Sequence, residues 1–169
     1  RYATFVELQD YCRRSADPVG RLLLRLFRTQ ARAENQQQLA WSDAICTSLQ
    51  LINHWQDIGI DWKKQRVYLP QEDLQRFGVD EAQIAVGLVD DKWRALLGFE
   101  VDRARTLMLE GAPLGRSLPG RIGLELRLIV AGGLRILEKI EAVNYDVFSR
   151  RPVLHAMDWP RLMWRALMT

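Results

Sequence analysis

The chain has 169 residues, of which 48% are hydrophobic and 27% are charged, so it can bury a substantial core within one domain. Its formal net charge of +3 agrees with an anionic substrate or a membrane surface, and no basic-aromatic stripe or zinc motif indicates nucleic-acid binding. The two cysteines, Cys12 and Cys46, form neither a metal-binding spacing nor a disulfide framework, which indicates reduced, buried thiols in a cytoplasmic protein.

Helical patterns follow one another through the first part of the chain. From residue 5 the apolar residues keep helical spacing up to Pro18, which must interrupt or kink the helix, and the pattern resumes over residues 19–27. Residues 29–38 are polar and predict a loop or an exposed helix end. Residues 39–62 predict one long and largely apolar helix.

Further helices are predicted in the remainder of the chain. Pro70 is expected at the first position of a short helix that ends at Gly78, and Asp80 is expected to cap another. Three longer helices are predicted over residues 90–110, 119–143 and 160–168. No segment shows the alternation of apolar and polar residues that is typical of a strand. We therefore predict an all-α fold with residues 1–169 in a single domain. The most apolar tract is interrupted by charges and is too short to span a membrane.

A strip of oxygen-bearing side chains is predicted near the end of the 39–62 helix. Asn53, Asp57 and Asp61 stand four residues apart and line up on one helical face, with Gln50 on its edge. The surrounding residues are apolar, so carboxylates there need a cationic partner. Apart from His54, no basic residue lies between positions 53 and 61, and we therefore expect an external cation. Oxygen ligands of this kind suit Mg²⁺.

Basic and phenolic side chains follow this strip directly. Lys64, Arg66 and Tyr68 lie in the connector before Pro70. An ammonium, a guanidinium and a phenol beside a metal site are suited to bind a diphosphate whose other oxygens contact the metal. Two aspartates at this spacing would by themselves be explained by a solvated helix face. The apolar setting and the basic segment together favour a site for metal and diphosphate.

Two segments resemble motifs of the squalene/phytoene synthase family. Residues 49–61, followed by residues 66–70, are similar to the second aspartate motif of that family. Residues 11–20 are similar to the family segment that opens with a functional tyrosine and closes on Val-Gly. A looser resemblance extends to residues 142–148 and so covers most of the chain. The Arg-Arg-Ser-Ala-Asp-Pro sequence in the tyrosine segment most resembles the hydroxysqualene synthase branch of bacterial hopanoid biosynthesis.

The resemblance implies an isoprenoid synthase fold around a central hydrophobic cavity, with Mg²⁺ held by Asn53, Asp57 and Asp61. It implies a catalytic role for Tyr11, near the reacting carbons. The residues expected to bind the diphosphate are Gln50, Lys64, Arg66 and Tyr68. Family members carry an earlier aspartate motif upstream of the tyrosine segment, and no residues before Tyr11 in this chain could supply that motif. We therefore interpret residues 1–169 as the C-terminal part of the domain, with the N-terminal helices absent.

For the hydroxysqualene branch, the resemblance implies presqualene diphosphate as the substrate, water as the terminating nucleophile and no NADPH. It also implies other proteins of the hopanoid pathway as functional partners and a location peripheral to the inner face of the membrane. Two alternatives stay open. One is another prenyl coupling enzyme of the same fold, namely presqualene diphosphate, squalene or phytoene synthase. The other is a non-catalytic assembly or interaction protein.

Several of these residues also have a purely structural explanation. Tyr11 could be a half-buried packing residue. His54 is rotated by about 100° from Asn53 on the helix, so we expect it to be packed or hydrogen-bonded rather than to bind metal. The 160–168 helix either anchors the protein at a membrane interface or caps the core. We also expect the absent helices to leave apolar faces of the 39–62 and 90–110 helices exposed.

Overall fold

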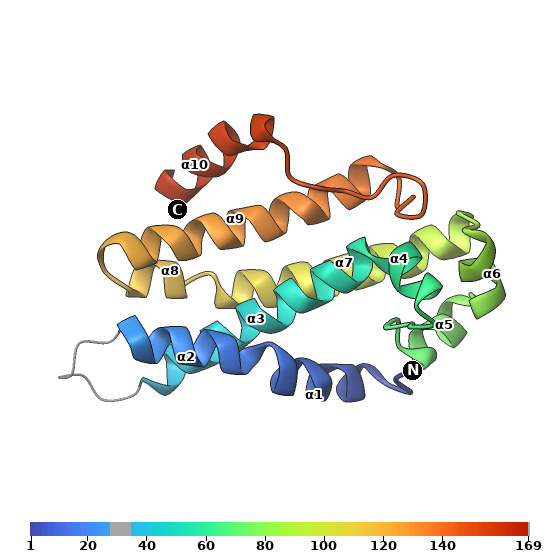
Figure 1. The fold of residues 1–169 in the computed structure, drawn as a ribbon, viewed down its shortest axis with the longest axis horizontal. Helices are drawn as coiled ribbons and strands as arrows, with labels where there is room; N and C mark the ends of the chain where they lie inside the picture. Colours follow the sequence, from blue (N-terminus) through green and yellow to red (C-terminus); the bar gives the residue numbers. More distant parts are fainter. Residues whose placement is uncertain (28–34, 169) are drawn as a thin grey trace.

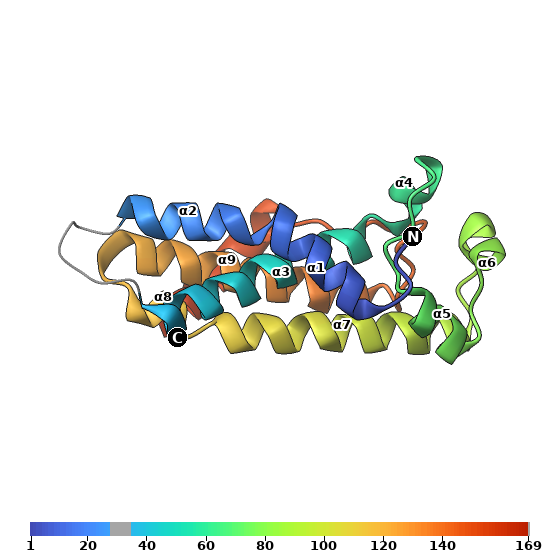
Figure 2. The ribbon, with the colours of Figure 1, turned by 90° about the horizontal axis from the view of Figure 1, so that it is seen from below.

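The computed structural model describes residues 1–27 and 35–168, and its regular elements are helices, as predicted. They are α1 (Phe5–Ser15), α2 (Asp17–Phe27), α3 (Gln36–Gln56), α4 (Ile58–Lys63), α5 (Gln71–Phe77), α6 (Glu81–Val86), α7 (Asp91–Gly111), α8 (Leu114–Ser117), α9 (Gly120–Ala142), η1 (Ala156–Asp158) and α10 (Trp159–Met168). No strand occurs within these two described ranges. The long helices α3, α7 and α9 pack side by side, with α1 and α2 on one side and α10 against α9 (Figures 1 and 2).

Most helix ends lie close to the predicted positions because side chains supply the missing hydrogen bonds there. The side chains of Asp80 and Asp90 accept backbone N–H groups three residues further on, each at 2.8 Å. Gly78 ends α5 with a φ of 65°, a conformation that glycine adopts without strain. Pro70 lies at the N-cap of α5 rather than at its first helical position. The predicted interruption near Pro18 is confirmed as the break between α1 and α2.

The predicted helix over residues 39–62 is wrong at both ends. Helix α3 begins at Gln36, because the Asn35 side chain caps it by accepting the Gln37 N–H at 3.0 Å. Residues 36–38 are therefore helical, while residues 28–34 lie outside the described part. At the other end the helix breaks at Asp57, whose ψ is 12°. The Asp57 carbonyl accepts the N–H groups of both Ile60 and Asp61, which tightens the chain into a turn.

The core lies where α3, α7 and α9 meet, and glycine lets α9 approach closely. Trp55 and Trp93 are fully buried in this core. A Cβ atom added to Gly133 would lie 2.6 Å from the Met108 methyl group and 3.3 Å from the Ile52 side chain. Gly133 therefore allows α9 to pack closely against α3 and α7.

Two other glycines of α9 form a matched pair for a stability test. A Cβ atom on Gly123 would overlap the Leu118 carbonyl oxygen, whereas the atom nearest to one on Gly132 is Leu154 Cδ1 at 3.6 Å. We expect Gly123→Ala to lower the free energy of unfolding by about 1–3 kcal/mol, because backbone atoms must shift. Gly132→Ala should be neutral or raise it by about 1 kcal/mol, since alanine favours helices. Urea denaturation measures both, and equal losses would contradict the packing of α9 on α8.

The two thiols lie near the α2–α3 contact and are both free. Cys12 is fully buried, as predicted, and burial raises the pKa of its thiol to about 12. Cys46 is only half-buried, although burial also raises its pKa. Neither thiol is therefore ionised near neutral pH.

Exposed apolar side chains gather on α2 and α10, which corrects the prediction that α3 and α7 would expose them. On α2 they are Val19, Leu22, Leu23, Leu26 and Phe27, and on α10 they are Trp159, Met163, Trp164, Leu167 and Met168. The faces of α3 and α7 are mostly buried because these helices pack on each other. Leu162 and Ala166 of α10 are buried against α9, so this helix caps the core, while its contact with a membrane stays a prediction. Among the described helices, none is both long and apolar enough to cross a bilayer.

Candidate active site

The predicted ligand strip stays on one face although the helix breaks within it. The Asp57 N–H donates to the Asn53 carbonyl at 3.0 Å, and the Asp61 N–H donates to the Asp57 carbonyl at 2.8 Å. These bonds keep the four-residue repeat of a helix across the break. Asn53 is exposed, Asp57 is half-buried and Asp61 is buried, so the strip runs from the surface into the protein.

Charges of both signs surround the Asp61 carboxylate. Burial raises the pKa of Asp61, Lys64 lowers it, Asp57 raises it and Arg66 lowers it, in decreasing order of effect. The effect of Asp57 indicates that the two carboxylates repel each other, and a divalent cation between them would relieve this repulsion. Two carboxylates and one amide fit Mg²⁺, which commonly retains water and substrate oxygens. In residues 1–27 and 35–168, no three His, Cys, Asp or Glu side chains group into a metal site.

A basic residue distant in the sequence contacts Asp57, a partner that the sequence analysis did not predict. The Arg151 Nε atom donates to Asp57 Oδ1 at 2.6 Å. The segment after α9 carries Arg151 to this position, because the adjacent Pro152 is buried and its carbonyl accepts a hydrogen bond from Gln56 Nε2. The two paired residues are 94 positions apart, so no local pattern could have revealed the contact.

Most of the predicted diphosphate-binding residues lie next to the buried end of the strip. Lys64 and Arg66 are exposed, and the Arg66 N–H donates to the Asp61 carbonyl at 2.9 Å, which holds the basic segment against α4. The residues Asp61, Arg66 and Tyr68 line one small recess together with His54. The structure therefore brings a carboxylate, a guanidinium and a phenol together at one point.

Tyr11 reaches this recess through a cluster of aromatic rings. Its ring centroid lies 6.0 Å from that of Tyr68 and 6.2 Å from that of His54. Tyr2 joins the same cluster, with its ring centroid 5.6 Å from that of Tyr11 and 6.1 Å from that of Tyr68. Our sequence analysis missed Tyr2 because it precedes the N-cap Thr4 of α1 and therefore belongs to no helical pattern.

His54 is a packing residue, as predicted. It is 3% exposed, and burial lowers its pKa to about 4, so the imidazole is neutral at pH 7. The ring stacks on Tyr68 with a centroid distance of 3.7 Å. Its Nε2 atom lies 3.3 Å from Nε2 of Gln50, so the structure places this predicted diphosphate ligand against His54. The stacked imidazole thereby positions the Tyr68 phenol beside Asp61.

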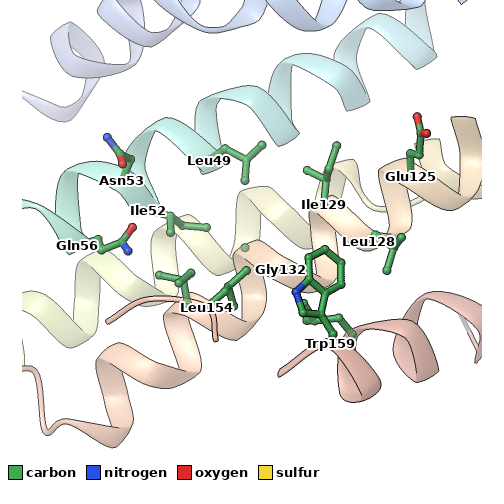
Figure 3. Close-up of a pocket in the computed structure, with 13 residues that line it drawn as sticks. Leu49, Ile52, Asn53, Gln56, Glu125, Leu128, Ile129, Gly132, Leu154 and Trp159 are labelled. Carbon is green, nitrogen blue, oxygen red and sulfur yellow. The ribbon is translucent and has the colours of Figure 1, made fainter. Parts of the chain in front are cut away.

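An apolar groove of about 560 Å³ begins beside the strip, between α3 and α9, with α10 along its edge (Figure 3). The apolar lining includes Leu49, Ile52, Leu128, Ile129, Gly132 and Leu154. Figure 3 shows the polar ends of Asn53 and Gln56 at one end of this lining. Because Asn53 belongs to both the strip and the groove, a molecule with an anionic head and an apolar tail can contact both.

The Tyr11 hydroxyl can be tested separately from its ring. Tyr11→Phe keeps the packing on Tyr68, so we expect the complete protein to stay folded but to turn over about tenfold more slowly, or with altered products. Rate and product ratio are the measurements. Tyr2→Phe, in the same cluster, is the control and should have the smaller effect. An unchanged rate and product spectrum for Tyr11→Phe would show that Tyr11 is a packing residue only.

Solved structures share the arrangement of helices described above. A squalene synthase, HpnC, from Alicyclobacillus acidocaldarius is similar with a TM-score of 0.79 and 41% identity, over 85% of this chain and 53% of that one. A dehydrosqualene synthase solved with a ligand is similar in fold, with a TM-score of 0.81 and 22% identity, over 99% of this chain and 58% of that one. The protein thus has the all-α fold of the isoprenoid synthases.

The chain belongs to the squalene/phytoene synthase family, whose model matches residues 1–158. It is 38% identical over 161 residues to a 15-cis-phytoene synthase of Synechocystis sp., and the matched region covers 89% of this chain and 47% of the relative. It is 32% identical over 169 residues to a phytoene synthase of Thermus thermophilus, which covers 99% of this chain and 56% of the relative. The chain spans about half the length of the curated relatives it matches.

Proposed function

We propose that the complete protein is a Mg²⁺-dependent synthase that ionises a prenyl diphosphate. The observation that carries this proposal is the strip of Asn53, Asp57 and Asp61, in which Asp61 lines the basic recess and Asn53 lines the apolar groove. An anionic diphosphate matches the strip and the exposed Lys64 and Arg66 beside it, and an isoprenoid chain matches the groove. Membership of the squalene/phytoene synthase family supports this choice of substrate class.

The residues of the site have separate roles in this proposal. Asn53, Asp57 and Asp61 would hold Mg²⁺, which when bound polarises diphosphate oxygens and neutralises their charge. Arg66 and Lys64 add positive charge as the diphosphate leaves. The apolar groove limits the access of water to the cationic carbon chain.

Tyr68 lines the recess, the Tyr11 ring centroid lies 6.0 Å from that of Tyr68, and we infer that the carbocation forms near these two rings. An aromatic face stabilises a nearby cation, and a phenol hydroxyl can hold or move a proton at its oxygen atom. His54 is neutral at pH 7 and its low pKa makes it a weak base, while its ring is stacked on Tyr68. It acts as a positioning residue for that phenol.

For the substrate, we infer presqualene diphosphate, with hydroxysqualene as the product and water as the terminating nucleophile. The similarity to the HpnC structure, which is described as a squalene synthase, supports a squalene-type product. The phytoene synthases among the relatives support the alternative, a coupling of two geranylgeranyl diphosphates. In the first case Mg²⁺ is the cofactor and NADPH is not required.

Product analysis separates these possibilities. The complete protein would be incubated with Mg²⁺ and presqualene, farnesyl or geranylgeranyl diphosphate, with and without NADPH, and pyrophosphate and hydrocarbon products would be measured. We expect hydroxysqualene from presqualene diphosphate without NADPH. Formation of phytoene from geranylgeranyl diphosphate would show that the substrate is geranylgeranyl diphosphate rather than presqualene diphosphate. No pyrophosphate from any of the three would favour the non-catalytic interaction protein.

A further inference from the structure

The contact between Arg151 and Asp57 places a resident cation on one of the proposed metal ligands. The distance of 2.6 Å joins Arg151 Nε to Asp57 Oδ1. The Arg151 side chain is 41% exposed and that of Asp57 is 17% exposed, so the pair lies at the rim of the site. A metal ion that takes this oxygen of Asp57 as a ligand competes with the guanidinium for it.

The segment that carries Arg151 is anchored at two points, one on each side of the break between α3 and α4. On one side, the Phe148 ring lies 4.7 Å from that of Trp93 and lies against Gly59, one residue into α4. On the other side, the Pro152 carbonyl accepts a hydrogen bond from Gln56, the last residue of α3. The segment therefore crosses the α3–α4 break and presents Arg151 to Asp57.

The guanidinium can leave this position without disturbing the core. Its pair with Asp57 lies at the surface, and such pairs add little to stability because water screens them and side-chain entropy is lost. Phe148 and Pro152 hold the backbone by packing and by the Gln56 bond, neither of which involves the Arg151 side chain.

We propose that Arg151 is a placeholder cation, which neutralises Asp57 in the metal-free protein and is displaced when Mg²⁺ binds. This rests on the proposed function, because it takes Asp57 as a metal ligand. The metal then replaces a positive charge rather than entering beside two unneutralised carboxylates. The repulsion between Asp57 and Asp61 is thereby reduced in both states, since one cation or the other always faces Asp57.

Metal binding without substrate tests this proposal directly. Mn²⁺, used as a probe of the Mg²⁺ site, would be titrated into the protein and the free ion measured by electron paramagnetic resonance. Removing the competitor with Arg151→Gln should tighten Mn²⁺ binding about 1.4- to 5-fold, the range that corresponds to a surface ion pair. The neighbouring, exposed Arg150 provides the matched control, and Arg150→Gln should leave the affinity unchanged.

A second measurement follows the guanidinium itself. In protein labelled with ¹⁵N-arginine, the Nε–H resonance of Arg151 is the one that disappears in Arg151→Gln. This resonance should shift as Mg²⁺ is added, and the midpoint of the shift should match the affinity of the protein for Mg²⁺. Arg150 should show no such shift. A resonance of Arg151 that stays fixed at saturating Mg²⁺ would overturn the placeholder role, even if the variant folds poorly.

Aspartate variants distinguish this failure from failure of the proposed metal site. If Asp57→Asn and Asp61→Asn weaken Mn²⁺ binding while Arg151→Gln leaves it unchanged or weakens it, the metal site stands and the placeholder proposal is wrong. If neither aspartate variant alters Mn²⁺ binding, the metal assignment fails, and the placeholder proposal fails with it.

Discussion

Replacing Asp61 with asparagine is expected to slow pyrophosphate release by the complete protein about 100-fold or more. Asparagine keeps the shape of the side chain but removes the charge that faces the metal, and water only partly replaces a carboxylate ligand. Asp57→Asn should act in the same direction. Turnover would be measured with presqualene diphosphate over a range of Mg²⁺ concentrations, where both variants should require more Mg²⁺.

The control for these variants is Asp91→Asn, a change at an exposed carboxylate at the start of α7. Its turnover should stay within about twofold of the wild type, since surface substitutions seldom matter. Thermal melting of all three variants would show whether a loss of rate reflects a loss of folding. Rates close to wild type in both Asp57→Asn and Asp61→Asn at low Mg²⁺ would refute the metal assignment.

A second large effect is expected at a buried carboxyl group remote from the site. Glu100 is fully buried on α7 beside Arg103, whose guanidinium lies 3.1 Å from it and 2.8 Å from Asp73 of α5. Burial raises the pKa of Glu100 to about 8, Arg103 opposes this rise, and the negative charge of Asp73 adds to it. Glu100 is thus protonated at pH 7 and can donate a hydrogen bond to Asp73.

Between pH 4.5 and about 8 the folded protein holds a proton at Glu100 that the unfolded chain releases. The stability associated with this proton is complete below pH 4.5 and is lost as the pH rises through about 8. Glu100→Gln removes the titration while keeping a neutral donor. The free energy of unfolding of the variant should therefore rise relative to wild type, by about 1 kcal/mol per pH unit in this window.

Urea denaturation of wild type and Glu100→Gln at pH 5.5, 7 and 8.5 would measure this difference. Asp17 has a pKa raised to about 6 by burial, and His54 has a lowered one, but both titrate alike in the two proteins and cancel in the comparison. Glu110→Gln, an exposed change on the same helix, should keep the wild-type dependence on pH. Parallel curves for wild type and Glu100→Gln would show that Glu100 is ionised when folded.

Local sequence signals were sufficient for the helices and for much of the strip. Capping by Asp80 and Asp90, and termination at Gly78, depend on bonds to residues a few positions away, and such signals can be read directly. The four-residue spacing of Asp57 and Asp61 likewise predicts a common face, because the helical hydrogen bonds persist across the break.

The remaining features depend on contacts between distant segments. The break after α3 comes with no proline and coincides with the packing of Phe148 on Gly59. The ion pair of Arg151 requires the fold to bring the segment after α9 back to the break between α3 and α4. Tyr2 enters the aromatic cluster because its carbonyl accepts the Gln71 N–H, which fixes the N-terminal segment beside α5. None of these contacts has a periodic signature.

The position of Asp57 between two helices has a consequence for which ions the strip can accept. On an unbroken helix, successive ligands four residues apart would be held at a fixed rise of about 6 Å. Asp57 belongs to neither α3 nor α4, so a small rotation about its ψ bond re-aims Asp61 relative to Asn53. The fit of a cation to the outer ligands therefore depends on the backbone angles of this one residue rather than on a fixed helical rise.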